Sequence, residues 1–205
     1  MAVRSACPMP SRKRASWRCM ARNRPGRVCS RWRIPEMPEP GASGEHRLAR
    51  LEARAEIGDL VARYALGADR KNDPAILGPL FAADAVWSAE GFSDLVGRDV
   101  IAAGLAGLAA DRVLWSIHYM VSPLIELAAD LRSGRCHWYL WELCTMAPAG
   151  GDPAHASPTD TWFGGWYDSD VVLTPEGWRF SRVKLDVRLQ GEAVPSWQFK
   201  KPVTL

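Results

Sequence analysis

Apolar residues recur at helical spacing in the segment 45–70. They stand at Leu48, Leu51, Ile57, Leu60, Val61, Tyr64, Ala65 and Ala68. Separations of mostly three and four residues place these side chains on one stripe, so the pattern predicts a long amphipathic first helix. Asp73 followed by Pro74 is an N-cap with proline at the first helical position, which predicts a short second helix ending at Phe81.

The next segment predicts a turn, a short strand and a third helix. The turn lies at residues 83–84, the strand at Ala85–Ala89, and a hairpin-like GFSD segment follows the strand. Residues 97–109 predict the third helix, because Ile101, Leu105 and Leu108 fall on one of its faces.

β-Branched and aromatic residues dominate the second half of the chain. Four long strands are predicted, at Val113–Leu127, Arg135–Met146, Thr161–Leu173 and Gly177–Leu189. Turn-forming residues separate them at 131–134, 147–158 and 174–177. Consecutive long strands with such turns form an antiparallel meander, and the three preceding helices must cover one of its faces. The sequence therefore predicts an α+β fold, a cone-shaped curved antiparallel sheet covered on its concave face by three N-terminal helices.

The first 34 residues differ in composition from the remainder. They contain nine Arg and one Lys without an acidic residue, whereas residues 35–205 contain 16 basic and 23 acidic residues, so the net charge of +3 is the sum of +10 and −7. A basic arm can bind nucleic acid or an anionic membrane. This arm has no periodicity, however, and no apolar run of the secretory or transmembrane kind follows its arginines. Its prolines also break the amphipathic helix of an organelle presequence.

We therefore expect three parts in the chain. Residues 1–44 form a disordered basic extension, residues 45–197 a single domain, and residues 198–205 a C-terminal tail. One interpretation of the extension is upstream sequence translated ahead of a start at Met37. Neither nucleic acid nor a membrane is an expected partner.

The cysteines and the absence of cofactor motifs restrict the chemistry. Cys136 and Cys144 lie eight residues apart on one face of a predicted strand, so buried free thiols and a reducing cytoplasm are expected. Cys7, Cys19 and Cys29 match no zinc pattern. The sequence contains no glycine-rich phosphate loop, Walker motif, HExxH motif or serine nucleophile elbow. We expect no metal site and no cofactor.

Tyr64, Asp69 and His118 are the residues that indicate proton-transfer chemistry. Tyr64 and Asp69 lie five residues apart on the predicted first helix, and His118 lies in a predicted strand. Proton abstraction beside a carbonyl needs a base near neutral pH, a partner that fixes its tautomer, and a donor for the carbonyl oxygen. Each residue also has a plainer interpretation: Asp69 as a turn residue, His118 as a structural histidine, and Tyr64 as a core tyrosine.

Two segments carry a resemblance to a known family. The stretch YALGADRKNDPAILGPLFAADAVW and the later FSRVKLDVRLQ, in this order of elements, resemble the SnoaL-like branch of the nuclear transport factor 2 superfamily over about residues 45–197. Its members include polyketide cyclases, ketosteroid isomerases, scytalone and bile acid dehydratases, small subunits of aromatic-ring dioxygenases, and noncatalytic transport and scaffold proteins. The fold alone therefore does not identify the function.

The resemblance also implies roles for the three residues. Dehydratases of this superfamily carry an Asp at the position of Asp69 that orients a catalytic His in the strand of His118, and in bile acid dehydratases a Tyr placed like Tyr64 acts as acid or carbonyl donor. Scytalone dehydratases have a Tyr where this chain has Ala68, and a second His where it has Trp141, Glu142 and Leu143. These departures argue against scytalone as the substrate.

The expected function is cofactor-independent dehydration or isomerisation of a small cyclic or polycyclic hydrophobic substrate. His118, oriented by Asp69, is expected to remove a proton and Tyr64 to donate a hydrogen bond. Trp87, Trp115 and Trp141 are candidate walls of the substrate pocket or ordinary core tryptophans.

Arg188 either binds a substrate carboxylate or belongs to a solvated, salt-bridged face with Arg182, Lys184 and Asp186. A homodimer through the outer sheet face is expected. The alternatives are a polyketide cyclase, and a noncatalytic subunit or ligand-binding module resembling the dioxygenase small subunit.

Overall fold

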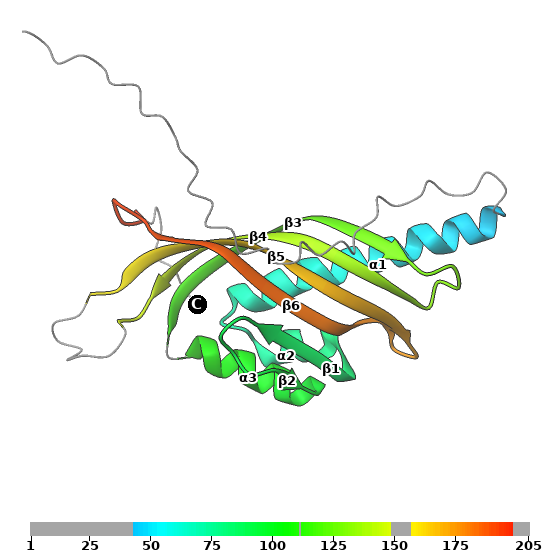
Figure 1. Cartoon of the computed structure of the whole chain (residues 1–205), viewed down its shortest axis with the longest axis horizontal. Coiled ribbons are helices and arrows are strands. Elements are labelled where there is room, and N and C mark those ends of the chain that lie inside the picture. The colour runs from blue at the N-terminus through cyan, green and yellow to red at the C-terminus, as the bar shows by residue number, and fades with distance from the viewer. Residues whose placement is uncertain (1–42, 111, 149–156, 199–205) are drawn as a thin grey trace, which may run out of the picture. The chain divides into compact units, whose positions relative to one another are not determined.

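The computed structural model describes residues 43–110, 112–148 and 157–198, all of which lie in the compact unit Met37–Leu205 (Figure 1). The predictions for residues 1–42 and for most of the C-terminal tail lie outside the described residues. Among the described helices, none combines the length and the apolar character that crossing a membrane requires.

Local sequence signals mark the starts of the first two helices. Helix α1 spans Gly44–Asp69, and the side chain of its N-cap Ser43 accepts a hydrogen bond from the His46 backbone. Asp73 caps the short helix α2, Pro74–Leu77, by accepting a hydrogen bond from the Ala75 backbone at 2.9 Å. A single 3-10 turn η1, Gly78–Leu80, follows it, and helix α3 spans Arg98–Ala110. Helices occur in all three predicted segments of the described residues, but the second ends at Leu77 rather than at Phe81, because Phe81 already pairs with β6.

In the described part of the chain, six strands form one sheet. Their bounds are β1 Phe81–Ala89, β2 Leu95–Val96, β3 Val113–Leu127, β4 Ser133–Met146, β5 Thr159–Thr174 and β6 Gly177–Glu192. The order is β2-β1-β6-β5-β4-β3, and β3 to β6 form the predicted antiparallel meander. Strand β1 pairs with β6 in parallel and with β2 antiparallel. It begins at Phe81 rather than at Ala85, because its first residues are already beside β6.

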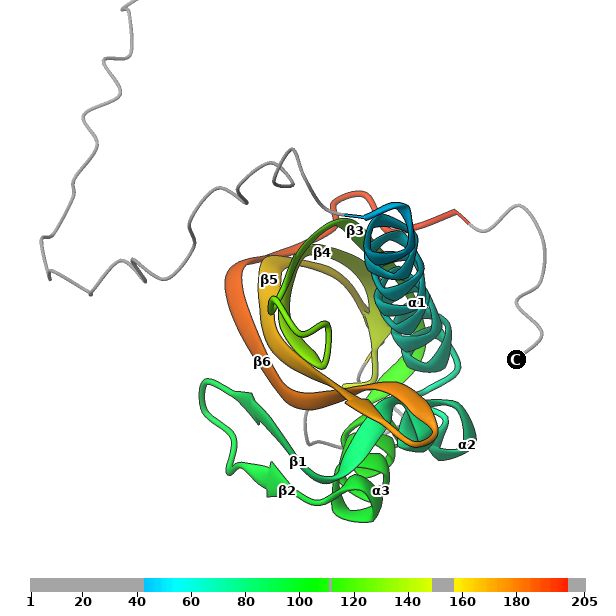
Figure 2. The same cartoon turned by 90° about the vertical axis from the view of Figure 1, so that its right-hand side faces the viewer.

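The sheet curves without closing, and α1 lies along its concave side (Figure 2). Helix α1 packs against β3 and helix α3 against β1. Buried aromatic rings fill the space between α1 and the sheet. They belong to Tyr64, Phe81, Trp138, Tyr167 and Phe180. The predicted α+β class is confirmed, and the concave face of the sheet is where the core lies.

A close helix contact holds the C-terminal end of α1 in place. At Gly67, an added Cβ would come within 2.5 Å of the Leu77 side chain, so the missing side chain allows α2 to approach. The Gly67 carbonyl accepts hydrogen bonds from the backbone of Arg70 and Asp73. The chain reverses here through Lys71 and Asn72, both of which have left-handed backbone angles. Asp69 is therefore presented at the rigid end of a helix.

Candidate active site

Asp69 and His118 form a direct pair between the end of α1 and the middle of β3. Oδ1 of Asp69 lies 2.8 Å from Nδ1 of His118 and accepts a second hydrogen bond from the His118 backbone N–H at 2.7 Å. One oxygen thus binds both the ring and the strand that carries it. This arrangement fixes the orientation of the imidazole and directs Nε2 away from Asp69.

A second carboxylate lies on the other side of the imidazole. Glu142 on β4 is the register partner of His118 on β3, and its Oε2 is 3.5 Å from Nε2. The side chains of His118, Asp69 and Glu142 are 11%, 31% and 17% exposed, so the ring is the most enclosed of the three. The imidazole of His118 therefore lies between two carboxylates. Its contact with Asp69 at Nδ1 has the length of a hydrogen bond, and its contact with Glu142 at Nε2 is longer and weaker.

Sequence reasoning missed Glu142 as a site residue. The signal that identifies it is its position on β4, where Leu140 and Cys144 two residues away on either side are buried. Alternate residues of a strand share a face. A carboxylate on an otherwise apolar inward face requires a partner.

The two carboxylates determine the charge of the imidazole. Burial by itself lowers the pKa of His118, but the hydrogen bond to Asp69, followed by the interactions with Glu142, outweighs it and raises the pKa to about 9. The ring is therefore cationic at neutral pH. Near the ring, burial raises the pKa of the Cys144 thiol to about 12, and its hydrogen bond to Glu142 adds to this effect. A neutral thiol thus lies beside the Glu142 carboxylate.

Tyr64 lies in the aromatic core, and its hydrogen-bond partners are Trp87 and Tyr167. The Trp87 Nε1–H donates to the Tyr64 hydroxyl at 2.9 Å, and the Tyr167 hydroxyl is hydrogen-bonded to the same oxygen. Burial raises the pKa of Tyr64 well above its ordinary value. Burial raises the pKa of Tyr167, and its interactions with Tyr64 and Glu142 add to this effect. Tyr64 is thus linked to the His118 site through Tyr167 rather than by direct contact with Asp69.

The three candidate wall tryptophans lie in different environments. Trp87 is buried in the core beside Tyr64. Trp115 and Trp141 each neighbour an inward residue in sequence, so strand alternation directs them to the outer face, opposite to His118. Trp141 is half exposed there and stacks on Trp162 with 5.0 Å between ring centroids. Of the three, the structure brings only Trp87 to the inner side.

Arg188 lies on the outer face of the sheet. Its side chain is exposed, pairs with Asp186, and places its guanidinium 4.8 Å from the centre of the Trp166 ring. Arg182 similarly pairs with Asp170. These contacts match the solvated, salt-bridged face considered for the sequence, and they hold Arg188 apart from His118.

A second histidine–aspartate pair also lies on the outer face. Nδ1 of His137 is 2.7 Å from Oδ1 of Asp168, at a register pair of β4 and β5. The ring packs near Tyr139 and Trp166. A histidine–aspartate contact is therefore insufficient to identify the site. What distinguishes His118 is the inner face and the second carboxylate, Glu142.

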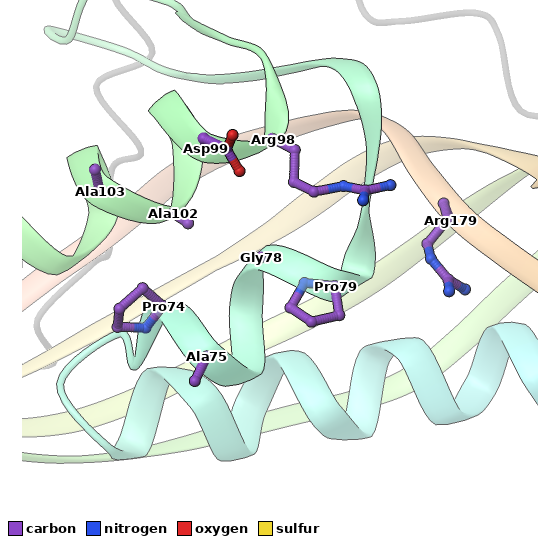
Figure 3. A pocket seen from close by; sticks show the side chains of 9 residues that line it. All are labelled: Pro74, Ala75, Gly78, Pro79, Arg98, Asp99, Ala102, Ala103 and Arg179. Carbon is purple, nitrogen blue, oxygen red and sulfur yellow. The ribbon is translucent and has the colours of Figure 1, made fainter. Parts of the chain in front are cut away.

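The described residues also include two thiols and an open groove. Cys136 and Cys144 are buried and free, as predicted. No group of three or more His, Cys, Asp or Glu side chains within residues 43–110, 112–148 and 157–198 could hold a metal ion. A groove of about 560 Å³ lies between α2 and α3 near Arg179 (Figure 3). None of its lining residues belongs to the His118 site.

Comparisons with known proteins agree with this architecture. The LinA-type3 hexachlorocyclohexane dehydrochlorinase of Novosphingobium barchaimii is 20% identical, with a TM-score of 0.64 over 76% of this chain and 99% of that one. A protein of Novosphingobium aromaticivorans with the proposed name scytalone dehydratase is 18% identical, with a TM-score of 0.58 over 74% and 92%. At these identities the likeness concerns the fold.

The sequence itself matches a family model. A search of curated proteins finds no match. The model of the SnoaL-like domain matches residues 49–184, which include Asp69, His118 and Glu142. The chain therefore belongs to the SnoaL-like domain family of the nuclear transport factor 2 superfamily.

Proposed function

We propose that this protein is a lyase or isomerase that converts a small hydrophobic cyclic substrate by proton transfer at His118, without a cofactor. The observation that carries the proposal is the Asp69–His118 pair, in which one carboxylate oxygen holds both the ring and its backbone. A histidine held in one orientation, with its other nitrogen free of that fixed hydrogen bond, is suited to acid–base catalysis.

The electrostatics of the site favour His118 as the proton donor. From the sequence, His118 was expected to act as a base, and a histidine must be neutral to accept a proton. Although burial lowers the pKa of His118, the two carboxylates raise it to about 9. At neutral pH the Nε2–H of the imidazolium can protonate a leaving hydroxyl or stabilise the negative charge of an enolate. Tyr64 is linked to this site through the hydroxyl of Tyr167, to which its own hydroxyl is hydrogen-bonded.

The surroundings of the site favour an apolar substrate. Met120 and Leu140, which form the register pair next to His118 and Glu142, direct their side chains to the same inner face. Phe163 is the register partner of Glu142 on β5. The dehydrochlorinase named among the similar structures acts, by its name, on a chlorinated cyclohexane. We therefore extend the proposal to elimination of either water or a halide from a ring.

The outer sheet face supports the proposed homodimer. Exposed apolar side chains lie there in adjacent register positions of β3 to β6. They belong to Tyr119, Val121, Tyr139, Trp141 and Leu189. A contiguous exposed apolar surface of this kind favours association, and a second copy would cover it from the side opposite to His118.

A turnover assay tests the proposed function. The purified protein is incubated with cyclic β-hydroxy ketones, β,γ-unsaturated cyclic ketones and polychlorinated cyclohexanes, and products are followed by the absorbance of the conjugated enone and by released chloride. We expect conversion in at least one class and loss of it, by about 10²-fold or more, in His118→Gln. His137→Gln is the matched control, because it alters the other histidine–aspartate pair. No conversion in any class would favour the noncatalytic alternative.

A further inference from the structure

In the function proposed above, Glu142 serves only to raise the pKa of His118, yet it is the second carboxylate beside the ring. Its Oε2 approaches Nε2, the ring nitrogen that Asp69 leaves unoccupied, at 3.5 Å. Burial of a carboxylate on an apolar strand face is costly unless a charge or a donor compensates it. The His118 imidazolium and the Cys144 thiol supply that compensation.

The two contacts of the imidazole differ in a way that suits two roles. The contact to Asp69 is 2.8 Å long and is reinforced by the backbone N–H of the same residue, so it is a fixed hydrogen bond. The contact to Glu142 is 3.5 Å, which is longer than an ordinary hydrogen bond. Asp69 therefore orients the ring, whereas Glu142 is held close by charge and can release Nε2 to a substrate atom.

We propose that Glu142 is the proton acceptor of this site and His118 its proton donor, and that the two exchange the transferred proton directly across the Oε2 to Nε2 contact. The inference rests on the proposed function and assigns the second half of its chemistry. In the described residues, the titratable groups that face this pair are Asp69 on α1, Cys144 on β4 and Tyr167 on β5. Burial keeps the thiol and the phenol protonated, and Asp69 already accepts two hydrogen bonds from His118. Glu142 is therefore the carboxylate available as a base.

With a β-hydroxy ketone as substrate, the reaction is the loss of water. Glu142 takes the proton from the carbon beside the carbonyl, and the electron pair of that C–H bond forms the new C=C bond. The C–O bond to the hydroxyl breaks, and the leaving oxygen takes the Nε2 proton of His118 and departs as water. Glu142 is then protonated and His118 neutral. Transfer of one proton from Oε2 to Nε2 restores both groups, with no other reactant. Because the two atoms are neighbours, they reach the substrate from the same side.

Ring titration by NMR tests the pair without any substrate. The His118 imidazole is followed between pH 5 and 10 in the full chain, in Glu142→Gln and in the control Asp168→Asn. We expect Glu142→Gln to lower the pKa of His118 by about one unit or more, because it removes an opposite charge next to the ring. Asp168→Asn is expected to leave it unchanged. A His118 pKa near 6.5 in the unaltered protein, or one that Glu142→Gln does not lower, would overturn the proposal.

Turnover then separates Glu142 from the proposed function. On a substrate that the unaltered protein converts, the turnover rate of Glu142→Gln is expected to be lower by about 10²-fold or more. Glu142→Asp, which keeps a carboxylate on a shorter side chain, is expected to recover part of that rate. Full activity of Glu142→Gln would refute the base assignment while leaving the role of His118 intact. If the unaltered protein converts none of the substrates, the proposed function fails, and the ring titration still decides whether Glu142 and His118 share a proton.

Discussion

Oδ1 of Asp69 accepts two hydrogen bonds from His118, one from the ring at 2.8 Å and one from the backbone at 2.7 Å. The pair joins the last residue of α1 to the middle of β3. A carboxylate at a helix C-terminus opposes the helix dipole and needs a nearby cation. The imidazolium of His118 is that cation, so the pair stabilises the helix end and orients the ring at the same time.

The charge of His118 makes stability depend on pH. A pKa raised from 6.5 to about 9 corresponds to about 3 kcal/mol of unfolding free energy. The folded form binds the proton more tightly, so this contribution is fully present below pH 6.5 and is lost as the pH rises to 9. We expect the urea midpoint to fall between pH 6 and 8.5. His118→Gln should show a flatter profile over the same range, and equal slopes for both proteins would contradict the assigned charge.

Two glycines of α1 should respond oppositely to alanine. At Gly67 the new Cβ meets the buried Leu77, so we expect Gly67→Ala to destabilise the fold by about 1–3 kcal/mol. Gly58 has nothing within 4 Å of the same position, so Gly58→Ala should stabilise the helix by about 0.5–1 kcal/mol. Chemical denaturation at constant slope measures both. A neutral Gly67→Ala would show that α2 can move away from α1.

Tyr64→Phe should destabilise the core. The hydroxyl is hydrogen-bonded to Trp87 and Tyr167, and its removal leaves both buried groups without that partner. We expect a loss of about 1–3 kcal/mol. Tyr119→Phe, on the exposed outer face, is the control and should change stability by less than about 0.5 kcal/mol. Thermal or urea unfolding compares the two variants, and equal effects would contradict the assigned role of the Tyr64 hydroxyl.

Cys136 and Cys144 should resist alkylation in the folded protein. Burial raises the pKa of both thiols to about 12, so few are ionised at pH 8, and both side chains are enclosed. Iodoacetamide treatment followed by peptide mapping should leave both residues unmodified in buffer and modify both in urea. Rapid labelling of either one in buffer would show that the sheet opens around it.

A charge on the outer face should prevent the proposed association. Trp141→Glu places a carboxylate in the middle of the exposed apolar surface, so we expect a dimer to become a monomer by sedimentation. Val100→Lys introduces a charge on α3, at another exposed apolar position, and should leave the mass unchanged. A protein that is monomeric before any substitution would refute the dimer.

Local patterns in the sequence determined most of the secondary structure. Helix α1 follows from its apolar stripe and α2 from the Asp73 cap, because both signals depend only on residues close in the chain. The four long strands follow from their composition and from the turns between them. The start of β1 at Phe81 could not be predicted from local patterns. Phe81 pairs with Phe180 of β6, and that parallel pairing forms only in the folded chain.

The site required the tertiary structure. Asp69 and His118 were recognised from the sequence, but Glu142 was not, because its nearness to His118 arises from the register of β3 and β4. An irregularity between Val121 and Leu124 shifts that register by one residue. His118 and Ile125 consequently both point inward although seven residues separate them, which strict alternation along β3 excludes.

Trp141 and Glu142 are adjacent in sequence and lie on opposite faces of the sheet. The sequence determined that neighbouring strand residues alternate. Which of the two faces α1 covers was decided by packing, since apolar burial favours the arrangement in which Trp138, Leu140 and Cys144 are enclosed. Glu142 is carried to the concave side with them, and it is stable there because His118 from β3 meets it with a positive charge.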